Sequence, residues 1–146
     1  VLRLDPAFAG ANNDLAYTWA EQGKNLSEAE QMVRKALTAE PDNPSFLDSM
    51  GWVLYKRGRF GEALGELQRA ALLADPVVLD HLGDTLYRLG EQAKASAQWQ
   101  QAAQKLGQPH DDDRDDLKKL REQLTRKQQQ LATGRPVEVA PVVEEK

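Results

Sequence analysis

Residues 44–75 read PSFLDSMGWVLYKRGRFGEALGELQRAALLAD, and they contain two amphipathic helical patterns back to back. In each pattern, apolar or small residues recur at i, i+3, i+4 and i+7, which places them on one face of an α-helix. The first face holds Leu47, Met50, Gly51 and Leu54, and the second holds Phe60, Ala63, Leu64, Leu67 and Ala70. We expect a turn at Lys56-Arg57-Gly58-Arg59. Gly51 and Ala63 are expected where the helices cross, because small residues let two backbones approach closely.

A single pair of helices has one buried seam and needs neighbours, and the same features recur on both sides of this stretch. The paired residues of the first helix are Leu15-Ala16, Met50-Gly51 and Leu82-Gly83, and the turn glycines are Gly23, Gly58 and Gly90. The second helices repeat an alanine pair, with a bulky residue four positions after its first member. The pairs are Ala29/Ala36, Ala63/Ala70 and Ala95/Ala102, and the bulky residues are Val33, Leu67 and Trp99. Pro6, Pro41 and Pro76 punctuate the chain at equal intervals, so the sequence predicts a stacked repeat array.

This pattern resembles the tetratricopeptide repeat, a helix-turn-helix unit of about 34 residues. The resemblance covers roughly residues 1–106, and the style of the repeats is similar to that of bacterial repeat proteins. It implies an all-α fold: a right-handed superhelix of three tetratricopeptide-like helix-turn-helix repeats plus a C-terminal capping helix. The expected divisions are the end of a preceding repeat (1–8), repeats at 9–43, 44–75 and 76–109, a capping helix (110–133) and an extended tail (134–146).

Several local features refine this expectation. Leu15, Ala16 and Trp19 are expected to face inward from the first helix, and Ser27 is expected to cap the second, with Glu30 completing a capping box. Pro44 is well placed to open the next helix. The spacing from Gly51 to Gly83 is three residues shorter than that from Ala16 to Gly51, so we expect a tighter junction between the second and third repeats.

A different pattern begins at Asp111. An acidic run precedes a single leucine stripe, and basic residues accumulate towards the end, which complements a helix dipole. The stripe consists of Leu117, Leu120, Leu124 and Leu131. It is thin, so this helix is expected to cover the last repeat, and a self-associating coiled coil would need more heptads. Beyond Gly134, two prolines and alternating valines favour an extended, unpacked tail.

Composition excludes several classes of function. The net charge of −4 and pI of about 5.2 argue against nucleic-acid binding. No apolar run is long enough to span a membrane. Cysteine is absent, which removes disulfides and thiolate metal sites without identifying a compartment. No cofactor motif is present, so none is expected.

Catalytic and metal-binding patterns are also weak. His81 and His110 have no second ligand at metal-binding spacing, and His81 is expected on the exposed side of its helix. Asp111, Asp113, Asp115 and Glu122 have some of the spacing of a calcium loop, but Asp116 stands where the turn glycine is required. The helix N-terminus already explains these acids. We therefore expect no enzyme and no metal site.

The resemblance implies a groove that holds partner peptides, lined by one face of the first helix of each repeat. Carried onto this sequence, the groove would present Asn13, Tyr17, Asp48, Ser49, Trp52, Tyr55, Lys56, Asp80, His81, Asp84, Tyr87 and Arg88. Trp52 is the expected ligand anchor, whereas Trp19 and Trp99 are expected in the core. For Tyr55 and Tyr87, packing between repeats is an equal alternative.

One binding mode of the family is disfavoured. Members that clamp a C-terminal carboxylate place Lys, Arg and Asn at set positions, and here these positions hold Asn13, Tyr17, Ser49, Val77 and His81. The balance of charge, with Asp48, Asp80 and Asp84 against Lys56 and Arg88, would favour a neutral or slightly basic segment with an apolar anchor.

The sequence therefore predicts a non-catalytic scaffold that binds an extended segment of a protein partner in the groove. One alternative is an accessory or oligomerisation module of a larger enzyme or export-linked assembly, with its chemistry outside this chain. Another is that the tail, residues 134–146, occupies the groove of its own or a neighbouring molecule, which leaves self-association open.

Overall fold

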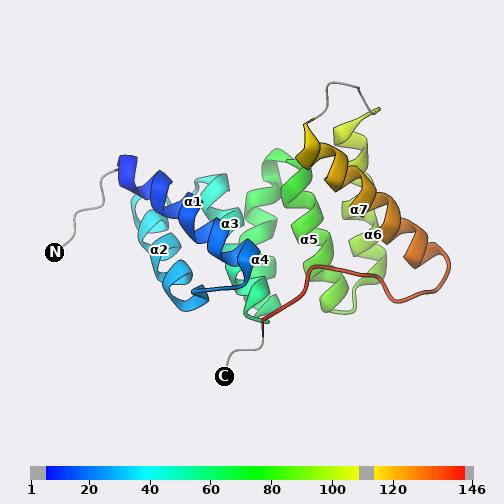
Figure 1. Ribbon diagram of the computed structural model, residues 1–146, viewed down its shortest axis with the longest axis horizontal. Helices are drawn as coiled ribbons and strands as arrows, with labels where there is room; N and C mark the ends of the chain where they lie inside the picture. Colours follow the sequence, from blue (N-terminus) through cyan, green and yellow to red (C-terminus); the bar gives the residue numbers. More distant parts are fainter. Residues whose placement is uncertain (1–5, 109–113, 144–146) are drawn as a thin grey trace. The chain divides into compact units, whose positions relative to one another are not determined.

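The computed structural model describes residues 6–108 and 114–143, which form seven α-helices, one short 3-10 helix and no strand (Figure 1). The elements in order are α1 (Pro6–Gln22), α2 (Leu26–Ala39), α3 (Pro44–Lys56), α4 (Phe60–Ala70), the 3-10 helix η1 (Ala71–Leu73), α5 (Pro76–Arg88), α6 (Gln92–Leu106) and α7 (Asp115–Ala132). The prediction of an all-helical chain is confirmed for this part of the sequence.

The helices group into two compact units. The first contains the described residues up to Leu73 together with those from Pro141 onward, and the second contains Ala74–Ala140. In the first unit α1 pairs with α2 and α3 pairs with α4, and α3 also contacts both α1 and α2. In the second unit α5 pairs with α6, and α7 lies against α6. This pairing of consecutive helices is the packing of a tetratricopeptide-like array. The division falls at the shortened connection that the sequence predicted between the second and third repeats.

The small residues of the repeat signature lie where paired helices make their closest contacts. A Cβ atom added to Gly51 would lie 2.5 Å from Cγ of Leu67, so a methyl group has no room between α3 and α4. At the equivalent position of the second unit, a Cβ on Gly83 would collide with the indole of Trp99. Leu67 and Trp99 are both fully buried. The alternation of small and bulky residues read from the sequence is therefore the packing rule of both helix pairs.

The starts and ends of the helices follow from local chemistry. Pro44 is the first residue of α3, as predicted, and the side chain of Asn43 accepts hydrogen bonds from the backbone N–H groups of Ser45 and Phe46. Asp75 caps α5 in the same way ahead of Pro76. Gly58 ends the first helix of its pair with φ at 78°, a conformation that a side chain would strain.

The predicted capping box of α2 is wrong. The residue at the N-cap is Asn25, held at φ 52°, so Ser27 lies inside the first turn and cannot cap it. Glu30 instead accepts hydrogen bonds from three arginines, Arg34 at 2.7 Å, Arg57 at 3.0 Å and Arg59 at 2.7 Å.

The cluster of arginines around Glu30 ties α2 to the turn between α3 and α4. Glu30 is buried, which by itself would raise its pKa, but the hydrogen bond from Arg34 and the charges of Arg59 and Arg57 lower the pKa below its ordinary value. The glutamate is therefore ionised at neutral pH and links consecutive helix pairs of the first unit.

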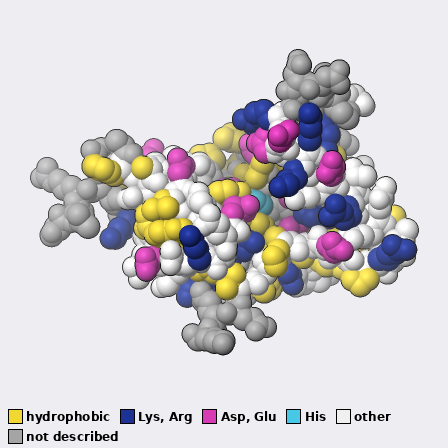
Figure 2. All heavy atoms as spheres, viewed as in Figure 1, with side chains coloured by type: hydrophobic (Ala, Val, Ile, Leu, Met, Phe, Trp, Pro, Cys, Tyr) yellow, Lys and Arg dark blue, Asp and Glu magenta, His cyan; other side chains and the backbone are white. Residues whose placement is uncertain are grey.

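Two side chains of α1 are more exposed than the sequence predicted. Leu15 is 43% exposed and Trp19 is only half-buried, although both were expected to face inward. The equivalent of Leu15 in the next repeat is Met50, which is buried because α3 packs on α2, whereas no described helix precedes α1. Phe8 is also exposed on α1, and Figure 2 shows hydrophobic side chains at the surface along this helix. Residues 6–8 belong to α1, and the division of the chain into repeats stays a prediction.

Helix α7 begins later than the acidic run predicted, at Asp115, and has no basic residue in its last turn. Leu120 and Leu124 are buried, and the third buried residue of this helix is Lys127. Figure 2 shows Lys and Arg side chains interspersed with Asp and Glu over the outer face of α7. The candidates His110, Asp111 and Asp113 lie outside the described residues, as do positions 1–5 and 144–146.

Replacing Gly51 with alanine is expected to destabilise the chain by about 1–3 kcal/mol, because the added methyl group overpacks the contact with Leu67. The matched control is Gly65→Ala in α4, where nothing lies within 4 Å of an added Cβ. This control should be more stable than the wild type by about 0.5–1 kcal/mol, since alanine has the higher helix propensity. Urea unfolding followed by circular dichroism measures both effects, and equal stability of the two variants would contradict the proposed packing rule.

Candidate functional site

The groove residues predicted in the first unit are mostly buried. Asn13 and Tyr17 lie on α1, and the other five lie on α3: Asp48, Ser49, Trp52, Tyr55 and Lys56. Tyr17 is half-buried, and each of the others is less than 9% exposed. Helices α1 and α3 contact each other, so these side chains are brought together, but they form a packed interior.

Trp52 is only 3% exposed, and a ligand contact at this residue stays a prediction. Its indole N–H donates a hydrogen bond to the carboxylate of Glu21, and its ring stacks on Tyr55 at a centroid distance of 4.7 Å. The ammonium of Lys56 lies 5.3 Å from the centre of the same ring. The expectation that Trp52 is an exposed anchor is therefore wrong. Tyr55 is fully buried against Trp52 and Phe60 of its own helix pair, and the alternative of packing between repeats stays a prediction.

The predicted residues of the second unit all lie on α5, and the most exposed of them lie at its C-terminal end. Asp80, His81 and Asp84 are buried, Tyr87 is half-buried and Arg88 is exposed. The expectation of an exposed His81 is wrong, because its side chain lies on the side of α5 that is covered within the folded chain. Among the predicted groove residues of α5, the accessible ones therefore lie in its last turn.

Two of the buried acids meet a lysine that the sequence did not single out. The ammonium of Lys127 on α7 donates hydrogen bonds to Oδ1 of Asp80 and to Oδ1 of Asp84, each at 2.6 Å. Asp84 Oδ1 also accepts a hydrogen bond from the indole N–H of Trp99 at 3.1 Å. The three charged side chains are at most 9% exposed, and the ammonium lies 5.5 Å from the centre of the Trp99 ring. This buried cluster fastens α7 to α5.

The cluster holds two carboxylates for one ammonium, and this imbalance determines its titration. Burial, together with the neighbouring Asp80 carboxylate, raises the pKa of Asp84 to about 6, although Lys127 and the backbone N–H of Ala140 act in the opposite direction. Burial alone would lower the pKa of Lys127, but the Asp84 and Asp80 carboxylates raise it above its ordinary value of 10.5. Lys127 therefore stays charged over the whole physiological range of pH.

The last turn of α5 binds the backbone of the chain's own tail. Three side chains make this contact, and we call Asp84, Tyr87 and Arg88 the α5 site. The backbone N–H of Val137 donates to the hydroxyl of Tyr87 at 2.9 Å, and that of Ala140 donates to Oδ2 of Asp84 at 3.1 Å. Arg88 donates to the carbonyl oxygen of Ala140 at 2.8 Å. An acceptor, a hydroxyl and a donor are thus placed to hold a non-helical peptide.

The two intervening amides are also hydrogen-bonded. Glu138 N–H donates to the side chain of Gln130 on α7 at 2.8 Å, and Val139 N–H donates to the carbonyl of Val137 at 3.1 Å, which forms a three-residue turn. Every backbone N–H from Val137 to Ala140 therefore has an acceptor. Val137 is 6% exposed, so its side chain is the apolar anchor of this segment. The described tail residues 135–143 form neither helix nor strand, and the expectation of an unpacked tail is wrong for Val137.

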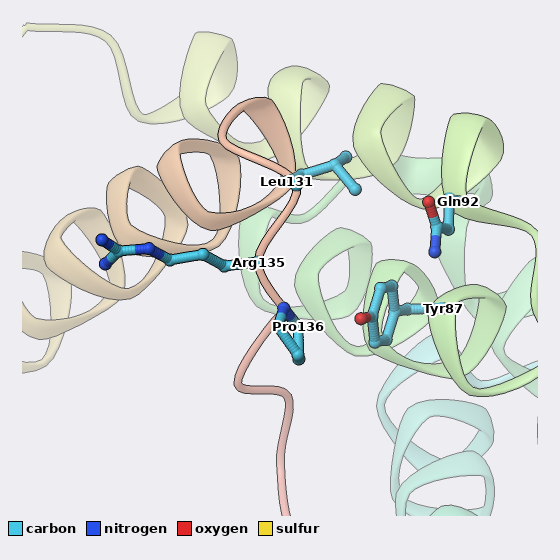
Figure 3. A pocket seen from close by; sticks show the side chains of 6 residues that line it. Tyr87, Gln92, Leu131, Arg135 and Pro136 are labelled. Atoms are coloured by element: carbon cyan, nitrogen blue, oxygen red, sulfur yellow. The ribbon is translucent and has the colours of Figure 1, made fainter.

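A pocket of about 270 Å³ adjoins this contact in the second unit. It is lined by Tyr87, Gln92, Leu131, Gly134, Arg135 and Pro136. Figure 3 shows the hydroxyl end of Tyr87 directed towards the ring of Pro136, whereas the side chain of Arg135 extends away from them. The pocket therefore lies where the tail turns from α7 onto α5.

In the first unit, the end of the described tail packs on the turns of two helix pairs. The backbone N–H of Val143 donates to the carbonyl oxygen of Lys56, the last residue of α3, at 2.8 Å. A Cβ atom added to Gly23 would lie 2.8 Å from Cγ2 of Val143, so the valine methyl occupies the space above this turn glycine.

Sequence reasoning identified Asp84, Tyr87 and Arg88 but missed their partners. The missed partners are Lys127 and Val137. Of these two, only Lys127 could have been identified from the sequence. Lys127 lies three residues after Leu124 and seven after Leu120, on the same helical face as the leucine stripe, where a lysine is unexpected unless it is paired.

Two kinds of site are absent from residues 6–108 and 114–143. None of these helices has the length and apolar composition needed to cross a bilayer. Within the same residues, no group of three His, Cys, Asp or Glu side chains is arranged to hold a metal ion.

Comparison with known proteins supports the prediction of tetratricopeptide-like repeats. No protein-family model matches the chain. The chain is 39% identical over 70 residues to a TPR repeat-containing protein of Pseudomonas aeruginosa, an alignment that covers 48% of this chain. The matched part of the chain spans only about 12% of the length of that relative. The match supports a tetratricopeptide-type family, in agreement with the packing of the helix pairs.

Replacing Lys127 with methionine is expected to cost about 3–5 kcal/mol at pH 7.5, because two carboxylates would remain buried without a counter-charge. The cost should shrink at pH 5. The folded-state pKa of Asp84, about 6, already exceeds its ordinary 3.8, so protonation of Asp84 favours the folded state as the pH falls through this window. Removing the ammonium raises this pKa further, which makes the gain on acidification larger in the variant.

Urea unfolding of wild type and variant at both pH values tests this expectation. The control is Lys118→Met, at an exposed position of the same helix, which should change stability by less than about 0.5 kcal/mol. A cost for Lys127→Met that is equally small, or that grows on acidification, would show that the cluster does not fasten α7 in solution.

Proposed function

We propose that this chain is a non-catalytic scaffold that binds an extended segment of a protein partner, and that the α5 site is one of its contact points. The resemblance to tetratricopeptide repeats and the similarity to a TPR repeat-containing protein support an interaction role. The binding of a partner segment rests on one observation, namely that Asp84, Tyr87 and Arg88 hold both ends of a four-residue non-helical segment, Val137 and Ala140, through its backbone.

The chemistry of the α5 site fits recognition of a peptide backbone. Arg88 supplies a donor for a carbonyl oxygen, and Asp84 and Tyr87 supply acceptors for two N–H groups three residues apart. Backbone contacts of this kind provide affinity with little dependence on sequence, and a buried side chain adds specificity. The remaining groove residues, on α1 and α3, stay a prediction, and their burial favours a structural role for Trp52 and Tyr55.

Lys127 of α7 changes the charge that we expect for a segment bound at the α5 site. The sequence predicted a preference for neutral or slightly basic segments because Asp48, Asp80 and Asp84 outnumber the groove cations. Lys127 pairs with both acids, and Arg88 is the exposed charged residue of the α5 site. We therefore propose that the α5 site takes a neutral or slightly acidic segment.

Selecting binders from a displayed library of twelve-residue peptides tests the proposal. Peptides selected on the full chain should bind the Arg88→Ala variant at least about tenfold more weakly, since a hydrogen bond from a charged donor is lost. The control is Arg126→Ala, at an exposed position of α7, and it should leave the affinity unchanged. Fluorescence anisotropy of the labelled peptides gives the dissociation constants. Equal binding by all three chains would place the peptide site elsewhere and contradict the proposal.

A further inference from the structure

We infer that residues 136–140 are a built-in occupant of the α5 site, and that partner segments compete with them by presenting the same pattern. This pattern is a proline followed by a β-branched residue, and then, three residues after the β-branched one, a residue whose backbone N–H and carbonyl oxygen are both bound. The inference rests on the proposed function, because it names the ligand chemistry of the same site.

The first argument is that the segment is held in one register. Its backbone N–H groups donate hydrogen bonds to Tyr87 and Asp84 on α5 and to Gln130 on α7, and one N–H donates within the segment. A one-residue slip would move Val137 out of its buried position and would break the pairing of Ala140 with both Asp84 and Arg88. A tail that merely lies on a surface would have no reason to satisfy four successive amides.

The second argument concerns which side chains the site reads. Val137 is 6% exposed, whereas Glu138 is exposed, and Ala140 is contacted through both its N–H and its carbonyl oxygen. Pro136 lines the pocket beside Tyr87, and its ring fixes the backbone angle ahead of the anchor (Figure 3). Side-chain selectivity therefore lies at positions 136 and 137, position 140 is recognised through its backbone, and position 138 is free to vary.

The third argument excludes recognition of a chain end. The groups that bind Arg88 and Asp84 are the carbonyl oxygen and the N–H of an ordinary peptide residue, Ala140, and the described chain continues through Val143. No free carboxylate is needed. The α5 site thus accepts an internal segment of a partner, in keeping with the missing cationic residues of the carboxylate-clamping subtype.

Because residues 136–140 are covalently linked to the α5 site, they lower its apparent affinity for partner segments. A ligand joined to its site by a short linker experiences an effective concentration of about millimolar, so a partner must outcompete the tail before it binds. The α7 helix ends at Ala132, four residues before Pro136, and its buried Lys127 holds the start of the linker close to α5. Weakening the tail is therefore expected to strengthen binding of a ligand added in trans.

The test uses the full chain and a labelled synthetic peptide of residues 134–143, GRPVEVAPVV. Val137→Asp places a charge in the buried anchor position and should expel the tail. This variant should bind the peptide at least about tenfold more tightly than the wild type in fluorescence anisotropy. The control Glu138→Ala changes an exposed side chain of the same segment and should behave like the wild type. A peptide carrying aspartate at the position of Val137 should not bind, and adding Arg88→Ala to the Val137→Asp chain should abolish binding.

If the folded Val137→Asp chain binds the peptide no more tightly than the wild type, the tail is not an occupant and the inference is overturned. The proposed function survives that result if library-selected peptides still depend on Arg88, and it fails with the inference if they do not.

Amide hydrogen exchange of the wild type provides a readout that does not depend on how the variant folds. The amides of Val137 to Ala140 should exchange at least about tenfold more slowly than in an unstructured peptide, and saturating free peptide should remove this protection. Unprotected amides in the wild type would overturn the inference without any variant.

Discussion

The structure depends on the close approach of paired helices at a residue without a side chain. Gly51 faces Leu67, and Gly83 faces Trp99, in contacts that leave no room for a methyl group. Both large side chains are fully buried, so each glycine lets its partner helix place a bulky residue against the backbone. The orientation of α5 against α6 determines where Asp84 lies relative to Trp99, since the indole N–H donates to that carboxylate. The α5 site is therefore built on the same contact that forms the helix pair.

Charged residues connect elements that the apolar pattern leaves separate. In the first unit, Glu30 accepts hydrogen bonds from Arg34, Arg57 and Arg59, which links α2 to the turn after α3. In the second unit, Lys127 links α7 to α5 through two buried carboxylates. The two clusters differ in the desolvation free energy that their formation costs. The arginines around Glu30 are partly exposed and retain some hydration, whereas the lysine cluster is buried on every member and depends on complete pairing.

The sequence indicated what depends on local spacing and missed what depends on tertiary neighbours. The helix pairs, Pro44 as a helix start and Gly51 at a crossing could be predicted because period and residue size act within about 35 residues. Ser27 looked like a cap, but the preceding turn placed the N-cap at Asn25. Of the candidate site, Asp84, Tyr87 and Arg88 were named in advance. Their burial and their partners were not, because nothing in the spacing of Val137 reveals that it meets a helix 50 residues earlier in the chain.

The separation in sequence of these contacts has a consequence for the order of folding. The helix pairs close through local contacts, such as Trp99 with Asp84 at a separation of 15 residues, whereas Lys127 and Ala140 reach Asp84 across 43 and 56 residues. Local contacts form faster because they close shorter loops. The pair α5–α6 therefore assembles first, with Asp80 and Asp84 still hydrated. Docking of α7 then removes water from both acids in one late step, and the tail settles onto a surface that this step has just completed.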